Sequence, residues 1–233
     1  MRLRRRSGST AISEHTQTTI NPPTSVTYTG SGELTLGTTE GPATDPWQPS
    51  STYSCGWTKS PPASISATYQ PQIGDKLPDG VFQDQCGDNV RLHDLLGRYL
   101  VIQAQQTNFT SCGPCSQGAT GQEAFETAME TAKISTLVVS MLVPEYFHSD
   151  LTAVLASMKS WVAQYGTAGV ALADRGYAPA IFRSVANSPD FGYPAYMLVA
   201  PDGTILEATV GIDVGPPSTW DKFQTAIEAH AGN

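Results

Sequence analysis

Two cysteines separated by two residues, Cys112 and Cys115, are the side chains of this sequence best suited to do chemistry. When such a pair stands at the start of a helix, unpaired N–H groups and the helix macrodipole stabilise a thiolate on the first sulfur. A stabilised thiolate attacks other disulfides and leaves easily, and the second cysteine resolves the mixed disulfide. Gly113 and Pro114 between them suit a helix start, because the N–H that proline lacks would have no partner there. The spacing therefore indicates dithiol–disulfide exchange.

Two other interpretations of the cysteine pair stay open. A C-x-x-C is half of many zinc sites, but zinc takes four ligands. The sequence has no second C-x-x-C, and its four histidines show no ligand spacing: His15, His93, His148 and His230. We therefore expect no metal at this site. The pair could also form a structural disulfide without catalysis.

The segments around the pair predict a strand, a loop and a helix. Residues 99–102 are apolar and rich in strand formers, and they run into the polar segment 103–107, which we interpret as a loop. Residues 117–133 carry apolar side chains at helical spacing. The cysteines would then open a helix that follows a buried strand.

The rest of the chain repeats a strand–helix rhythm. We predict strands over 134–143, 169–173, 196–200 and 205–211, and helices over 150–165 and 220–230. The last two strands are joined by Pro-Asp-Gly-Thr, a strong hairpin signal. These elements predict an α/β domain whose mixed sheet is flanked by helices, with parallel crossovers first and an antiparallel hairpin last.

Four blocks, taken together and in order, resemble the thioredoxin-like superfamily, and most closely its redoxin branch. That branch contains peroxiredoxin relatives and the extracytoplasmic thioredoxins of cytochrome maturation. The blocks are Ile73–Pro78, Phe82–Gly97, Cys112–Cys115 and Tyr193–Gly203. The resemblance implies a three-layer thioredoxin-like fold over residues 69–233. It also implies an enzyme that exchanges its dithiol or disulfide with protein substrates and with a redox-partner protein.

The resemblance assigns roles to individual residues. Cys112 would be the attacking thiolate, Cys115 the resolving thiol, and Gly113 and Pro114 the turn that sets the potential. In this family a cis-proline before the penultimate strand faces the cysteines, and Pro194 takes that position, with Tyr193 beside it on the substrate-facing wall. No metal and no organic cofactor is implied.

Two departures from the family pattern concern the proton chemistry and the partner surface. Gln106 stands six residues before Cys112, where thioredoxin has a buried aspartate that accepts a proton, and Ser111 replaces the tryptophan before the first cysteine. Water or a carboxylate from elsewhere would then relay the proton, or Cys115 would be deprotonated less readily. These changes weakly favour an alternative function, a non-catalytic binding module with a permanent disulfide.

The sequence argues against a thiol peroxidase. A peroxiredoxin has P-x-x-x-[TS]-x-x-C around its peroxidatic cysteine. Counted back from Cys112, the threonine position is Phe109 and the proline position is Gln105. Peroxide reduction is therefore a minor alternative.

The other two cysteines, Cys55 and Cys86, are candidates for a structural disulfide that fastens the segment before the domain to its first hairpin. In the chain-entropy model, closing a loop of this size contributes on the order of 3 kcal/mol. The alternatives are two independent thiols, or a mobile cysteine that resolves Cys112. A disulfide here would favour maturation in an oxidising compartment.

Composition separates an N-terminal extension, residues 1–68, from the domain. Within 7–50, 17 residues are Ser or Thr, which predicts a flexible tether. Arginines at 2, 4, 5 and 6 resemble the start of an export signal, but no apolar stretch follows and none in the chain is long enough to span a membrane. The formal net charge of −8 argues against nucleic-acid binding. We expect a monomer in the periplasm or cell envelope, with the cytoplasm as the alternative.

Overall fold

A computed structural model of the protein describes residues 27–29, 33–35, 52–57, 70–107, 113–143, 150–165, 169–187 and 191–232. Most of the expected extension lies outside these ranges, so its boundary with the domain at residue 68 stays a prediction. Within it, strands β1 (Thr27–Thr29) and β2 (Glu33–Thr35) form a two-stranded antiparallel sheet of their own.

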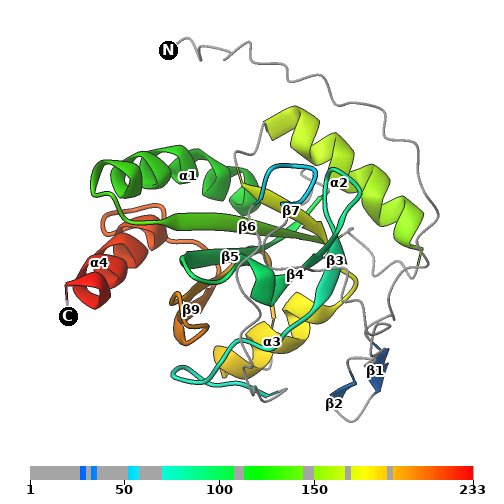
Figure 1. The fold of residues 1–233 in the computed structure, drawn as a ribbon, viewed down its shortest axis with the longest axis horizontal. Helices are drawn as coiled ribbons and strands as arrows, with labels where there is room; N and C mark the ends of the chain where they lie inside the picture. The colour runs from blue at the N-terminus through cyan, green and yellow to red at the C-terminus, as the bar shows by residue number, and fades with distance from the viewer. Residues whose placement is uncertain are drawn as a thin grey trace.

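A five-stranded mixed sheet forms the centre of the domain (Figure 1). Its order is β7-β6-β5-β8-β9. The strands are β5 (Tyr99–Gln106), β6 (Thr136–Val143), β7 (Val170–Ala173), β8 (Ala195–Val199) and β9 (Ile205–Val210). The first three are parallel, and β8 and β9 join them as an antiparallel hairpin. The sheet has the parallel-then-antiparallel arrangement that the sequence predicts.

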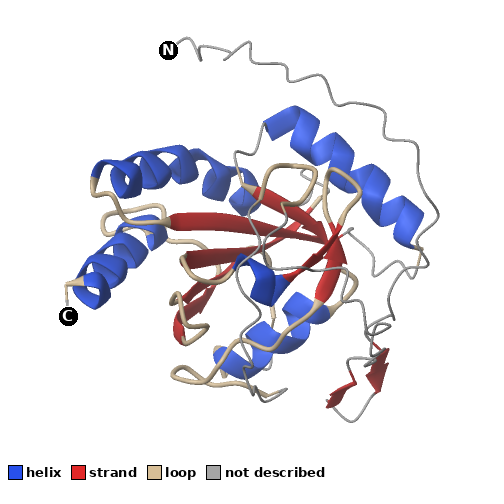
Figure 2. Cartoon of the chain, viewed as in Figure 1, coloured by secondary structure: helices blue, strands red, loops and turns tan. Residues whose placement is uncertain are grey.

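Helices cover both faces of this sheet, which gives three layers (Figure 2). Strand alternation assigns the faces, because Tyr99 and Val101 pack with α1 (Gly113–Thr131) and α4 (Thr219–Ala231), while Leu100 and Ile102 pack with α3 (Tyr177–Val185). Helix α2 (Leu151–Tyr165) packs on the β6–β7 edge, on the same face as α1. The α/β fold class is therefore confirmed.

A short hairpin precedes the central sheet. Strands β3 (Val81–Gln83) and β4 (Asn89–Arg91) pair antiparallel and lead into the 3-10 helix η1 (Leu92–Leu95). The turn of this hairpin reaches the outer strand of the sheet, since Asp84 forms an isolated bridge with Leu172 of β7. The hairpin thus continues the central sheet beyond its outer strand β7, next to the part of the core that packs against α3.

Two local predictions were wrong. The expected loop over 103–107 is mostly strand, because β5 continues to Gln106 and the side chains of Gln103 and Gln105 are buried with hydrogen-bonding partners. Helix α3 was not predicted at all. Three N–H groups at its start, those of Gly176, Tyr177 and Ala178, donate hydrogen bonds to the buried carboxylate of Asp174. These hydrogen bonds satisfy N–H groups that have no partner within the helix, and the buried residues Ala178, Ile181, Phe182 and Val185 recur at helical spacing.

Helices α1 and α4 approach closely where a glycine faces a tryptophan. A Cβ built on Gly121 of α1 would lie 2.3 Å from the Trp220 ring of α4. Trp220 is buried, packs against Phe125 at 5.1 Å between ring centroids, and donates a 3.0 Å hydrogen bond to the carbonyl of Gly118. The indole therefore has little freedom to retreat.

We predict that Gly121→Ala lowers the free energy of unfolding by about 1–2 kcal/mol, because overpacking outweighs the better helix propensity of alanine. Urea denaturation measures the change. Gly215→Ala is the matched control, since a Cβ there meets nothing within 4 Å, and it should stay within about 0.5 kcal/mol of the wild type. Equal stability of the two variants would show that the contact between Gly121 and Trp220 leaves room for a methyl group.

Candidate functional site

Cys115 stands in the first turn of α1 and is fully buried. Its sulfur is part of a disulfide. Gly113 and Pro114 form the preceding residues of the same helix, and Cys112 lies outside the described residues. Three of the four motif residues therefore occupy a helix N-terminus, where unpaired N–H groups favour a negatively charged sulfur.

Pro194 lies at the edge of the sheet from which the chain enters α1. The Tyr193–Pro194 peptide bond is cis. Strand β8 begins at the next residue, and Ala195 pairs with Ala104 near the carboxyl end of β5. Since β5 ends at Gln106 and α1 begins at Gly113, the cis-proline and the start of the cysteine helix belong to the same end of neighbouring strands.

Tyr193 is half-buried beside this proline. Its ring packs edge-on against Phe191, with 4.8 Å between centroids. Burial raises the pKa of Tyr193 far above its ordinary value, so the phenol stays protonated at any physiological pH. Tyr193 is thus an uncharged aromatic side chain that packs with the core on the α3 face of the sheet.

A chain of buried amides lies beneath α1. Gln105 Nε2 donates to Gln103 Oε1 at 2.9 Å, and Gln103 Nε2 donates to Gln122 Oε1 of α1 at 3.0 Å and to Ser140 Oγ of β6 at 2.6 Å. Gln122 in turn donates to Glu126 at 2.9 Å. This amide chain joins β5, β6 and α1 through side chains, in addition to the backbone bonds of the sheet.

Tyr196 of β8 brings a further polar group to the same helix. Its hydroxyl lies so close to Gly118 that a Cβ there would be 1.9 Å away. Gly118 follows Cys115 by three residues, so both occupy one side of α1. Burial raises the pKa of Tyr196. The phenol is thus neutral and within one helical turn of the buried sulfur.

Comparison with known proteins adds to this geometry. No protein-family model matches the chain, and no curated protein does. Solved structures do match. The thioredoxin domain of a thiol-disulfide oxidoreductase from Bacteroides vulgatus is 15% identical, with a TM-score of 0.50 over 69% of this chain and 98% of that one. A protein described as thiol:disulfide interchange protein DsbE from Chlorobium tepidum is 19% identical, with a TM-score of 0.51 over 68% and 96%.

A third match is a thiol:disulfide interchange protein from a Bacteroides species, 14% identical, with a TM-score of 0.51 over 70% of this chain and 93% of that one. The chain has the thioredoxin fold. At these identities the likeness is one of architecture, so the activity must be argued from the site itself.

Within the thioredoxin fold, the position expected for a buried acid needs a correction. Counting from Cys112 gave Gln106, but strand alternation places Gln103 and Gln105 on the face beneath α1, and both are fully buried while Gln106 is only half-buried. The nearest carboxylate joined to these amides is Glu126, which comes from α1 itself. Burial raises the pKa of Glu126 above its ordinary value.

The amides and Glu126 were missed by sequence reasoning, although a signal existed. Gln103 and Gln105 continue the alternation begun by Tyr99 and Val101, all four on the α1 face. An alternating pattern predicts a strand whether or not its later members are polar. The partner on α1 could not be anticipated, because it depends on how the helix is placed over the sheet.

The two remaining cysteines are joined. Cys55 and Cys86 form a disulfide with 5.7 Å between Cα atoms, as one of the sequence interpretations proposed. It fastens the segment Thr52–Trp57 to the β3–β4 turn, and Tyr53 adds a buried 2.7 Å hydrogen bond to Asp94. Asp84 lies beside the sulfurs, and the three groups could bind a metal ion only if the disulfide were first reduced.

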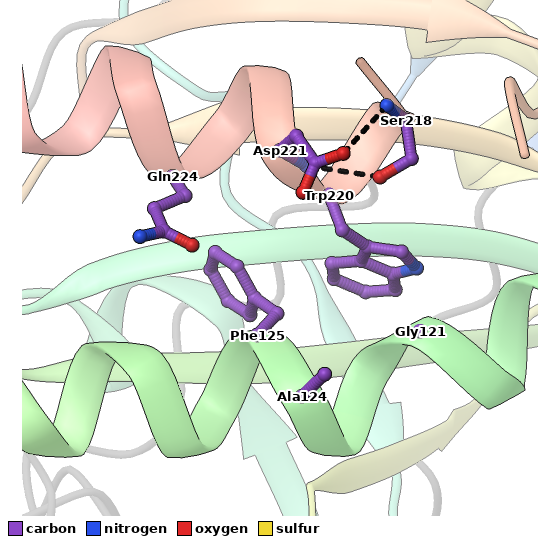
Figure 3. A pocket seen from close by; sticks show the side chains of 7 residues that line it. All are labelled: Gly121, Ala124, Phe125, Ser218, Trp220, Asp221 and Gln224. Atoms are coloured by element: carbon purple, nitrogen blue, oxygen red, sulfur yellow. Dashed lines mark hydrogen bonds between the residues drawn. The ribbon is translucent and has the colours of Figure 1, made fainter. Parts of the chain in front are cut away.

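A small pocket between α1 and α4 is drawn in Figure 3. It has a volume of about 150 Å³ and is bordered by Trp220, Phe125 and Gln224. Ligand pockets usually measure roughly 300–1,000 Å³. Ser218 and Asp221 at its rim cap α4 by exchanging hydrogen bonds, so their polar groups already serve the helix. This pocket is part of the helix packing.

Within the part of the chain that the structure describes, no helix combines the length and the apolar character needed to cross a bilayer.

We predict that Gln103→Met destabilises the protein by about 1–3 kcal/mol, because the buried partners of Gln103 lose their hydrogen bonds. Chemical denaturation followed by circular dichroism measures the change. Gln224→Met is the matched control, since Gln224 bonds Glu228 on the exposed surface of α4. A loss no larger than that of the control would mean that the buried amides find other partners.

Proposed function

We propose that this protein is a thiol–disulfide oxidoreductase that acts on protein substrates through Cys112 and Cys115. The observation that carries the proposal is a buried, disulfide-bonded Cys115 in the first turn of a helix, with the cis-Pro194 at the same edge of the sheet. A disulfide that served only to hold the fold would need neither the helix N-terminus nor the proline beside it.

The reaction is a pair of thiol exchanges. In the reduced protein the Cys112 thiolate attacks one sulfur of a substrate disulfide, whose bond breaks, and the released substrate sulfur takes up a proton. Cys115 then loses its proton and attacks Cys112 in the mixed disulfide, which frees the second substrate thiol. Two electrons pass to the substrate, and the protein is left with a Cys112–Cys115 disulfide. The reverse sequence oxidises a substrate dithiol.

The protein's own residues prepare these steps. The N–H groups at the start of α1 stabilise the attacking thiolate, so Cys112 is the better nucleophile. Pro194 and Tyr193 form the wall along which an extended substrate segment lies, as the family resemblance suggests. Beneath the helix, neutral amides and the Tyr196 hydroxyl surround the buried end of the site. Proton removal from Cys115 therefore depends on water or on a more distant carboxylate.

An oxidising compartment suits this proposal. The Cys55–Cys86 disulfide is only half-buried, and such bonds persist where reducing systems are absent. We therefore propose the periplasm or cell envelope as its compartment, in keeping with the low charged fraction of 15% and the Ser/Thr-rich segment before the domain. The monomeric state and the identity of the redox partner stay predictions.

The first prediction from this function concerns the two cysteines separately. Cys112→Ser should abolish the protein's acceleration of insulin reduction by dithiothreitol, because the attacking thiolate of the protein is gone. Cys115→Ser should instead accumulate a mixed disulfide with substrate on Cys112, because the resolving thiol is gone. Turbidity and mass spectrometry measure the two outcomes. Ser160→Ala, a substitution on the exposed side of α2, is the control and should leave turnover unchanged. Absence of turnover in the parent protein would favour the non-catalytic binding module, and full turnover by Cys112→Ser would overturn the role of Cys112 as the nucleophile.

The second prediction is the reduction potential of Cys112–Cys115. After equilibration in graded glutathione buffers and alkylation, mass spectrometry should give a value of roughly −120 to −270 mV, the range of exchange enzymes. Its place in that range tells whether the protein donates or accepts electrons. A value below about −300 mV, with Cys112 inaccessible to alkylation, would identify a permanent structural bond instead.

A further inference from the structure

The turn of the β3–β4 hairpin brings a carboxylate against the second disulfide. Cys86 lies in this turn, and Cys55 comes from the segment Thr52–Trp57, 31 residues earlier in the chain. One carboxylate oxygen of Asp84 and the two sulfurs all lie within 4.8 Å of one another. Both cysteines are half-buried, whereas Asp84 is completely buried.

The two oxygens of Asp84 have different surroundings. Oδ1 accepts hydrogen bonds from the backbone N–H groups of Cys86 and Asp88, both at 2.9 Å, and so holds the turn. Oδ2 is buried, and no described group donates a hydrogen bond to it. The turn requires only Oδ1, which an asparagine would supply without a charge. Because an oxygen of this carboxylate lies within 4.8 Å of both sulfurs, the Asp84 carboxylate is an acceptor suited to the S–H that would form if the neighbouring disulfide were reduced.

We propose that Cys55–Cys86 is a second thiol–disulfide exchange centre, in which Asp84 gives a proton to the departing sulfur and takes it back on reoxidation. Neither cysteine is fully buried, as attack by an incoming thiolate requires, whereas the neighbouring Asp84 is completely buried. This centre is separate from Cys112 and Cys115, so the inference goes beyond the proposed function and does not depend on it.

The reductant is a dithiol, either a small molecule or a protein C-x-x-C. One of its thiolates attacks a sulfur of the Cys55–Cys86 bond, the bond breaks, and the departing cysteine takes the proton of the Asp84 carboxyl. The second thiolate of the reductant then attacks the mixed disulfide and releases the other cysteine, which takes a proton from water. The reductant leaves as a disulfide, having given two electrons. Asp84 regains its proton from solvent.

The surroundings of Asp84 favour a carboxyl that can give up a proton near neutral pH. Burial raises the pKa of Asp84 to about 6, with a smaller contribution from the negative charge of Asp88 on the same turn. Strand β7, against which Asp84 lies, is Val-Ala-Leu-Ala and carries no charge. The segment 52–57 carries none either, and its Tyr53 stays protonated because burial raises the pKa of that phenol.

The test measures how fast dithiothreitol reduces Cys55–Cys86 in the full chain carrying Cys112→Ser and Cys115→Ser. Samples between pH 5 and 8.5 are quenched by alkylation, the Cys55 and Cys86 peptides are quantified by mass spectrometry, and each rate is divided by the thiolate concentration of the reductant. If Asp84 donates a proton, the corrected rate rises about tenfold as the pH falls through about 6.

The variant Asp84→Asn separates proton donation from simple charge repulsion. Asparagine keeps the Oδ1 acceptor for the turn, and circular dichroism checks that the variant is folded. Proton donation predicts a corrected rate that is independent of pH and equal to the slow, high-pH rate of the parent. Repulsion of the incoming thiolate by an ionised Asp84 predicts instead the fast, low-pH rate at every pH, which would overturn the proposal.

Asp88→Asn is the matched control. Asp88 is a carboxylate of the same turn that bonds Ser54. Since its charge raises the pKa of Asp84, the variant should keep the rise in rate but move it to lower pH. The proposal fails if the corrected rate of the parent does not rise as the pH falls. This outcome is measured on the parent alone, so it does not depend on whether an Asp84 variant folds. It also fails if dithiothreitol does not reduce Cys55–Cys86 in the folded chain.

Discussion

Hydrogen bonds among buried amide side chains join the cysteine helix α1 to strands β5 and β6 at the site end of this structure. Strand β5 is the central strand of the sheet and pairs with β6 on one side and β8 on the other. Its last residues include two fully buried glutamines, which in an apolar layer would be costly. Gln103 donates to Gln122 on α1 and to Ser140 on β6, and Gln105 donates to Gln103, so most of that cost is offset and the cysteine helix is joined to the strand that precedes it. The position of Cys115 follows from this arrangement.

The sequence predicts elements well where periodicity is strong and poorly where local polar chemistry decides. Strands β6, β8 and β9 and helices α2 and α4 agree with their predicted ranges to within one or two residues, because their apolar side chains repeat at strand or helix spacing. The end of β5 was assigned to a loop because its glutamines looked solvated. Gln103 bonds partners 19 and 37 residues away, and a local sequence pattern does not contain such partners.

The residues of the candidate site also differ in how well the sequence predicts them. The cysteine pair is visible from spacing alone, and the cis-proline only from the family resemblance, since nothing in the dipeptide Tyr193–Pro194 distinguishes it. Asp84 could not be found from either. It lies in the block Phe82–Gly97, which assigned it no role, and its position beside the sulfurs arises because the hairpin turn is bridged to β7 and the disulfide joins Cys55 to this turn. Groups brought together by tertiary structure are the ones that sequence reading misses.

The two pairs of cysteines meet opposite electrostatic surroundings, and this difference bears on how each would react. Cys115 lies in the first turn of a helix above neutral amides, where the helix dipole favours a thiolate. Cys55 and Cys86 lie beside a buried carboxyl, whose ionised form would disfavour a second negative charge. The first environment favours a sulfur that attacks and leaves as an anion, and the second favours one that leaves as a neutral thiol. A single chain can therefore hold two disulfides of different reactivity, because the proton accompanies the sulfur in one and not in the other.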